Sequence, residues 1–162
     1  MKRLAAAATL TAAALLLSGC SLIGDLTNQT QRDPSGSVVE GNDDADVFAI
    51  KVGDCLNDAT ASGTVTEVPI VPCSEPHDSE AYASIQVEDG DFPGDEAIKE
   101  QADADCVAAF GDFVGVEYND SELEYTYYFP SAESWEQGDR EILCEVYDPD
   151  SQTTGSLEGS ER

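Results

Sequence analysis

Apolar and polar residues alternate along several short segments of the chain, and this pattern predicts β-strands. Phe48, Ile50 and Val52 predict a first strand, which ends at the turn formed by residues 53–54. The same alternation recurs in four further segments, at residues 65–73, 83–87, 123–129 and 142–146. The prolines of segment 65–73 lack a backbone N–H donor, so this strand is expected to be irregular or to lie at an edge. The pattern therefore predicts about five strands.

One segment has the spacing of a helix rather than of a strand. Residues 95–110 carry apolar side chains at intervals of three and four, which would form one buried helix face. These side chains belong to Ile98, Ala102, Cys106, Ala109 and Phe110. Asp95 is expected to cap the start of the helix, and Gly111 to follow its end. Together the elements predict an α+β fold, in which one main helix packs on a small antiparallel sheet of about five strands.

The N-terminal segment has the three parts of an export signal. Lys2 and Arg3 form a basic start, and residues 4–17 form an apolar run that is shorter than the roughly 20 residues needed to cross a bilayer. Residues 17–20, Leu-Ser-Gly-Cys, resemble the lipobox of bacterial lipoproteins. We therefore expect a signal peptide over residues 1–19 and an acylated Cys20. This lipid anchor would hold the mature chain on the outer face of the cell membrane.

Composition predicts the remaining boundaries. Residues 20–46 are rich in Ser, Thr, Asn, Gln, Gly and Asp and have no periodic apolar face, which predicts a flexible tether that begins at the lipidated cysteine. A folded domain is expected over residues 47–157. A loose tail is expected over residues 158–162, with Leu157 docked just before it.

The cysteines favour disulfides over a metal site. Cys20 belongs to the export signal, and the other four are Cys55, Cys73, Cys106 and Cys144. An even number in an exported chain is typical of two disulfides, which have three possible connectivities. The apolar faces of the helix and of the last strand carry Cys106 and Cys144, which favours a bridge between these two and another between Cys55 and Cys73. Zinc is disfavoured, because the chain has no C-x-x-C pair and a single histidine.

Acidic residues dominate the charge of the chain. It contains 34 Asp and Glu against 7 Lys and Arg, which gives a net charge of −27. Such a surface repels phosphates, so nucleic-acid binding is excluded as a function class. A basic partner, an atmosphere of cations or adaptation to a salty habitat all fit this charge. The acidic pairs do not match a calcium-binding loop, so we expect no metal site and no cofactor.

Two segments collect side chains that could carry chemistry. Residues 73–78 place Ser74, His77 and Asp78 within a few positions, a set that an envelope enzyme could use for nucleophilic catalysis. A disulfide-bonded Cys73 would offer no thiolate there. Residues 134–140 hold the only tryptophan, which would cover the sheet or anchor a partner. Arg140 is expected to pair with a carboxylate, either Glu136 or an acid more distant in the sequence.

Several motifs in order resemble the septum-formation domain family of actinobacterial envelope proteins. They are V-G-D-C-L at residues 52–56, V-P-C-S-E-P-H-D at 71–78, F-P-G at 92–94, S-W-x-x-G-D-R at 134–140 with the following Cys144, and T-G-S-L at 154–157. The resemblance spans nearly all of residues 53–157. It implies an extracytoplasmic domain, often beside a membrane anchor, that is associated with cell division. It implies no catalytic mechanism.

These observations favour a non-catalytic domain that binds an envelope protein or a wall component, with a possible link to septum formation. The candidate binding surface consists of Glu75, His77, Asp78, Trp135, Asp139 and Arg140. Two other classes remain open. One is an envelope enzyme that uses Ser74, His77 and Asp78, and the other is a lipoprotein that captures a cation or a substrate.

Overall fold

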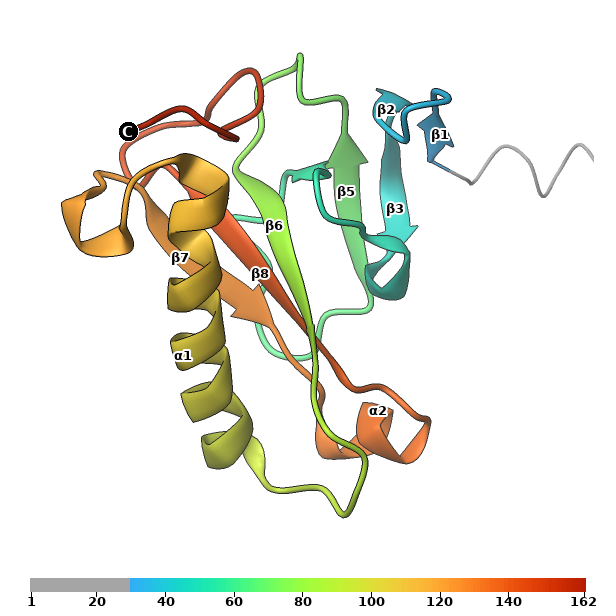
Figure 1. The fold of residues 1–162 in the computed structure, drawn as a ribbon. Coiled ribbons are helices and arrows are strands. Elements are labelled where there is room, and N and C mark those ends of the chain that lie inside the picture. Colours follow the sequence, from blue (N-terminus) through green and yellow to red (C-terminus); the bar gives the residue numbers. More distant parts are fainter. Residues whose placement is uncertain (1–29) are drawn as a thin grey trace, which may run out of the picture.

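A curled, six-stranded antiparallel sheet forms the centre of the structure (Figure 1). The structure is a computed structural model, and it describes residues 30–162. In spatial order the sheet consists of β3 (Asn42–Asp46), β5 (Glu67–Val71), β4 (Cys55–Leu56), β6 (Ser79–Gln86), β8 (Glu141–Tyr147) and β7 (Glu124–Tyr128). A separate ribbon is formed by β1 (Gln31–Arg32) and β2 (Val38–Glu40). The α+β fold is confirmed, with six strands in the main sheet.

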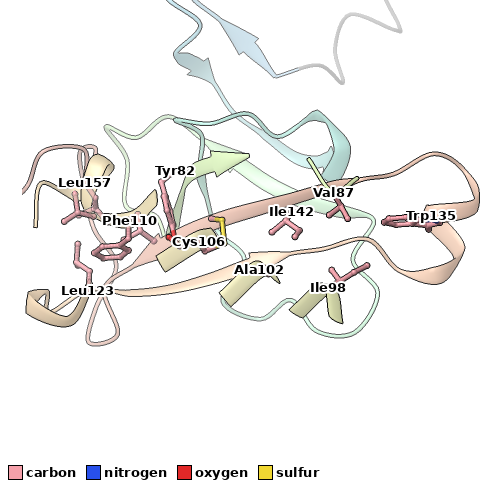
Figure 2. Close-up of a cluster of buried hydrophobic side chains, with 13 residues drawn as sticks. Tyr82, Val87, Ile98, Ala102, Cys106, Phe110, Leu123, Trp135, Ile142 and Leu157 are labelled. Atoms are coloured by element: carbon pink, nitrogen blue, oxygen red, sulfur yellow. A yellow bond between two sulfur atoms is a disulfide. The ribbon is translucent and has the colours of Figure 1, made fainter. Parts of the chain in front are cut away.

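The main helix, α1 (Asp95–Val114), packs against β6, β8 and β7 (Figure 1). Its buried residues recur at every fourth position, at Ile98, Ala102, Cys106, Phe110 and Val114. Figure 2 shows the first four of these side chains, Ile98 to Phe110, along the core, which runs from Trp135 at one end to Leu123 and Leu157 at the other. The remaining helical elements are α2 (Ala132–Glu136) and two short 3₁₀ helices, Val47–Ala49 and Tyr118–Asp120.

The helix is one turn longer than the sequence predicts. Gly111 lies inside α1, and the helix ends at Gly115, whose φ of 94° is left-handed. Val114 continues the buried row beyond Phe110, so packing against the core outweighs the low helix propensity of one glycine. At the other end the N-cap position is Gly94 rather than Asp95, which is the first helical residue.

Both predicted disulfides are confirmed. Cys55 bonds to Cys73 with Cα atoms 5.2 Å apart, and Cys106 bonds to Cys144 with Cα atoms 5.6 Å apart. The second bridge joins the middle of α1 to the middle of β8, and its sulfur atoms are visible in the core in Figure 2. The alternation on β8 and the helical spacing on α1 therefore identified the correct partners.

The folded part of the chain begins earlier than predicted. Residues 47–49 form a 3₁₀ helix instead of a strand, and the Asp46 side chain accepts a hydrogen bond from the Phe48 amide at 2.9 Å. The first strand of the sheet is instead β3, which pairs with β5. Gly41 permits this close approach, because a Cβ atom there would lie 2.6 Å from the carbonyl oxygen of Ile70.

A buried ion pair attaches the N-terminal ribbon to the domain. The guanidinium of Arg32 donates to both carboxylate oxygens of Asp54, at 2.5 and 2.6 Å, and Asp54 is 1% exposed. Residues 31–46 are therefore paired structure, which corrects the prediction of a flexible tether for this stretch. The predicted signal peptide, Cys20 and the first part of the tether lie outside the described residues.

The strand that contains Pro69 is not at an edge. β5 lies between β3 and β4, and Pro69 is tolerated there for two reasons. It lies just beyond the positions that pair with β4, and it lies opposite a register shift in β3. Neither strand pairing therefore needs a backbone N–H from Pro69. The carbonyl of Pro69 accepts a hydrogen bond from the amide of Asn57 at 3.0 Å. The prediction of an irregular strand is confirmed, and that of an edge strand is wrong.

The C-terminal residues are bound to the domain rather than loose. Leu157 is 4% exposed and docks in the core, as predicted. Beyond it, the amides of Gly159 and Glu161 donate to the carbonyls of Phe113 and Val114, at the end of α1. Arg162 forms ion pairs with Asp148 at 2.7 Å and with Glu122 at 2.8 Å. Within residues 30–162, no helix is long and apolar enough to span a membrane.

Candidate functional site

The candidate binding residues from the sequence fall at opposite ends of one strand pair. β6 and β8 pair from Ser79 with Tyr147 to Gln86 with Glu141. Residues 75–78 precede the first end of β6, whereas residues 135–140 precede β8 at the other end. An eight-residue strand spans about 26 Å. The structure therefore does not bring the two predicted clusters together into one surface.

His77 is an internal residue rather than part of a surface. Its side chain is 0% exposed, and its backbone forms a bridge with Thr153. The ring nitrogen Nδ1 lies 2.8 Å from the carbonyl oxygen of Glu75, and Nε2 lies 2.9 Å from the hydroxyl of Thr153. Since a carbonyl only accepts, Nδ1 carries the proton and Nε2 accepts from Thr153. The ring attaches the C-terminal segment to the start of β6.

Ser74 and Asp78 do not form a catalytic triad with this imidazole. Both ring nitrogens of His77 are already engaged by other groups, and Ser74 is exposed. Asp78 accepts from the amide of Ala59 at 3.0 Å and from the Gln152 side chain at 2.9 Å. Glu75 is the exposed member of this cluster. The arrangement lacks the nucleophile-to-base hydrogen bond that such catalysis requires.

A group of potential metal ligands next to His77 is engaged in other bonds. One ligand atom each from Cys55, His77 and Glu80 lies within 4.8 Å of the others. The sulfur of Cys55 is bonded to Cys73. The carboxylate of Glu80 accepts from the hydroxyl of Ser156 and the amide of Leu157. These atoms therefore connect the T-G-S-L segment to β6.

The second predicted cluster closes the other end of the core. Trp135 is 5% exposed and its indole N–H donates to the carbonyl of Gly90 at 3.0 Å. The guanidinium of Arg140 lies 3.7 Å from the centre of the indole ring and forms an ion pair with Asp89 at 3.0 Å, rather than with Glu136. Asp139 accepts from the Ser134 hydroxyl and the Glu141 amide. Trp135 thus covers the core, which is the first of its two predicted roles.

A cleft lies on the face of β7 and β8 that points away from α1. Its volume is about 1220 Å³, and its lining comes from β7, β8, the start of β6, residues 47–48 and the loop of residues 58–66. Further lining comes from α2 and the residues that flank it, from residues 148–152, and from Asp95 at the start of α1. Alternation explains which strand residues face it. Ile142, Cys144 and Val146 pack toward α1, so Leu143, Glu145 and Tyr147 face the cleft.

Two carboxyl groups define the chemistry of this cleft. Asp58 accepts from the hydroxyl of Ser79 and from that of Tyr128, each at 2.8 Å. Glu145 is 1% exposed. Burial raises the pKa of Glu145 well above its usual range, and the charge of Asp58 and a hydrogen bond with it act in the same direction. Burial likewise raises the pKa of Tyr128, so its hydroxyl remains a donor. These effects favour the protonated form of Glu145 beside Asp58.

The lining is acidic and aromatic. Nine of the lining residues are Asp or Glu, and among the described residues that line the cleft there is no Lys, Arg or His. The aromatic side chains include Phe48, which is 62% exposed, together with Tyr128 and Tyr147. A concave surface with one sign of charge concentrates its field, so this cleft favours positively charged ligands.

Sequence reasoning missed this site because the alternation identified only one buried face of β8. The curl of the sheet covers part of that face with a second apolar cluster, which includes Ile70, Ala81 and Leu143. Leu143 lies between Ile142 and Cys144, whose side chains pack toward α1, so its own side chain points to the opposite face of β8. An apolar residue at that position was the signal in the sequence that this face is also covered. No comparable signal marked Asp58, which lies in a loop.

Replacing Glu145 with Gln should flatten the dependence of stability on pH. The folded state holds the Glu145 proton more tightly than the unfolded chain does, so this contribution to stability is complete below pH 4.5 and is lost as pH rises through the raised pKa. The introduced amide would keep the shape of the side chain and a donor toward Asp58 but cannot ionise. The variant should therefore gain thermal stability relative to the parent as pH rises above 4.5 toward the raised pKa.

Thermal melting at several pH values would test this expectation, with Glu88→Gln as a control that removes an exposed carboxylate outside the cleft. Burial also raises the pKa of Glu80, but that contribution is common to all three proteins and cancels in the difference. Parallel melting curves for Glu145→Gln and the parent over this range would contradict a proton held on Glu145.

Comparison with known proteins agrees with the order of the sequence motifs. The family model described as Septum formation matches residues 20–161. No curated protein and no solved structure gives a match. The matched residues include both disulfides, the bridge between His77 and Thr153, the buried Trp135 and the residues that line the cleft. Because it extends over most of the chain, the protein belongs to the Septum formation family.

Proposed function

We propose that this protein is a lipid-anchored domain on the outer face of the cell membrane, where it binds an envelope protein or wall component during septum formation without catalysing a reaction. The acidic cleft beside β7 and β8 is the binding site in this proposal. The observation that carries it is a cleft of about 1220 Å³ whose described lining has nine acidic residues and no basic one.

The membrane anchor rests on the sequence. The basic start, the short apolar run and the Leu-Ser-Gly-Cys motif at residues 17–20 support acylation of Cys20. Two disulfides support an oxidising compartment. Cys20→Ala in the full chain should move the protein from the membrane fraction to the soluble fraction. Unchanged membrane association of this variant would contradict the anchor.

Binding without catalysis is favoured over an envelope enzyme by the geometry of His77. A general base must accept a hydrogen bond from its nucleophile, and Nε2 of this ring is engaged by the hydroxyl of buried Thr153 rather than by exposed Ser74. The candidate surface of the sequence contributes little to binding, because His77 and Trp135 are buried. The acidity of the cleft favours a partner with positive charge. A capture role for cationic ligands is therefore compatible with the same site.

Photo-crosslinking from the cleft would test the proposed binding site. Thr126 is exposed, lies on β7 opposite Glu145 and lines the cleft, so a photoreactive residue there should form a covalent adduct in intact cells. Ala108 is exposed on α1 and serves as the matched control position. The adduct should appear from position 126 alone, and should decrease when Asp58 is replaced by Asn. Equal adducts from both positions would contradict a binding role for the cleft.

The position and timing of septa in a deletion strain test the link to division independently of the crosslinks. A strain that lacks the gene should show misplaced or delayed septa, and the parent protein should restore them. The Asp58→Asn variant should restore them less completely if the cleft is the working surface. Normal septa in the deletion strain would contradict the link to division and leave the binding site to be judged by the crosslinks.

A further inference from the structure

One carboxylate oxygen in the cleft has an unusual environment. The Oε1 atom of Glu145 is buried, and within residues 30–162 it has no hydrogen-bond partner. A buried polar atom without a partner costs about 1 to 3 kcal/mol, and most such atoms in proteins are paired. Glu145 lies in the lining of the cleft, opposite Thr126 of β7 and Ala81 of β6. This acceptor is therefore available to a donor that enters from the cleft.

The groups that face Glu145 all favour a cation. The loop after β4 contributes Asp58, and β7 contributes Tyr128, whose hydroxyl is bonded to Asp58. β6 contributes no charged group at the positions beside Glu145, which are Ser79 and Ala81. No basic side chain is among the described lining residues. A ligand that carries both a positive charge and hydrogen-bond donors would satisfy Asp58 and the Oε1 atom together.

The aromatic side chains narrow the class of cation. Tyr128 and Tyr147 line the cleft near the two carboxyl groups, and Phe48 lines it from the 3₁₀ helix. Aromatic faces attract organic ammonium groups, whereas calcium takes six to eight oxygen ligands. An ammonium group has three N–H donors, so it could donate to the unpartnered Oε1 atom of Glu145 and also to Asp58, which already accepts from two hydroxyls.

We propose that the cleft binds a primary ammonium group between the carboxyls of Asp58 and Glu145, with one of its N–H groups donated to the unpartnered Oε1 atom of Glu145. This inference rests on the proposed role of the cleft as a binding site. The balance is simple: the alkylammonium keeps its charge, a protonated Glu145 becomes a carboxylate that accepts one of the ammonium N–H groups, and the proton of Glu145 passes to the solvent. The ammonium takes the position of the proton between the two acids.

Calorimetric titration of the full chain with n-butylammonium chloride tests this proposal. Measurements near pH 7 in phosphate and in a sulfonate buffer, which differ in heat of ionisation, give the number of protons released. We expect saturable binding that is accompanied by proton release, with at most one proton released per ammonium bound. Tetramethylammonium carries the same charge but has no N–H donor, and it should bind at least about tenfold more weakly.

Two variants make the test specific. Glu145→Gln should fold normally, weaken butylammonium binding by about tenfold and abolish proton release, because it loses the second carboxylate. Glu88→Gln, which removes an exposed carboxylate elsewhere, should change neither quantity. Melting curves and circular dichroism of both variants would establish that they are folded before binding is compared.

Three results would overturn the inference: no saturable butylammonium binding, equal binding of tetramethylammonium, or displacement of butylammonium by millimolar calcium with the same dependence on Glu145. These results are distinct from failure of the proposed function. If butylammonium fails to bind while position 126 still forms its adduct, the ammonium proposal alone is wrong. If both fail, the cleft is not the binding site.

Discussion

Replacement of both Cys106 and Cys144 with Ala should lower the free energy of unfolding by about 4 kcal/mol. The bridge closes a loop of 38 residues and joins the middle of α1 to the middle of β8. Without it, the unfolded chain regains the conformational freedom that the loop had removed. Both residues are also 0% exposed, so the smaller alanine side chains would leave the core less well packed.

Urea denaturation of the variant and the parent would measure this loss. The matched comparison is Cys55→Ala with Cys73→Ala, which opens a loop of 18 residues and should cost about 3 kcal/mol. Most domains of this size have a total stability of about 5 to 15 kcal/mol, so either loss should be plain in the midpoint. A cost below about 1 kcal/mol for the Cys106 and Cys144 pair would contradict a stabilising role for this bridge.

The success of the disulfide prediction shows which information the local pattern contains. On α1 and β8 the periodicity states which side of each element is buried, and two cysteines on facing buried sides must lie close together. The same reasoning failed at residues 47–52. There Phe48 and Val52 alternate as in a strand, but both are exposed, and the Asp46 side chain binds the Phe48 amide and starts a 3₁₀ turn.

The candidate site was harder to predict because it depends on tertiary structure. Glu145 occupies a position where alternation predicts a solvated side chain, which is the ordinary place for a glutamate. Only the curl of the sheet and the approach of the loop that holds Asp58 bury it. Local sequence does not encode that approach. The reverse error occurred at His77, because a histidine among proline, serine and aspartate looks like a surface residue.

Replacement of His77 with Ala should lower the free energy of unfolding by about 3 kcal/mol. The imidazole is 0% exposed, and its loss would leave a cavity and two polar groups without their partner, the carbonyl of Glu75 and the hydroxyl of Thr153. The damage should extend to the C-terminal segment, because the bridge between His77 and Thr153 lies beside the contacts from Ser156 and Leu157 to Glu80.

Ser74→Ala is the matched control, since Ser74 is exposed and its loss should change stability by less than about 0.5 kcal/mol. Urea denaturation combined with hydrogen exchange at residues 153–157 measures both the global and the local effect. A large loss of stability together with faster exchange in the C-terminal segment would assign His77 to the architecture of the domain. An alanine variant as stable as the parent, with unchanged exchange at residues 153–157, would contradict that role.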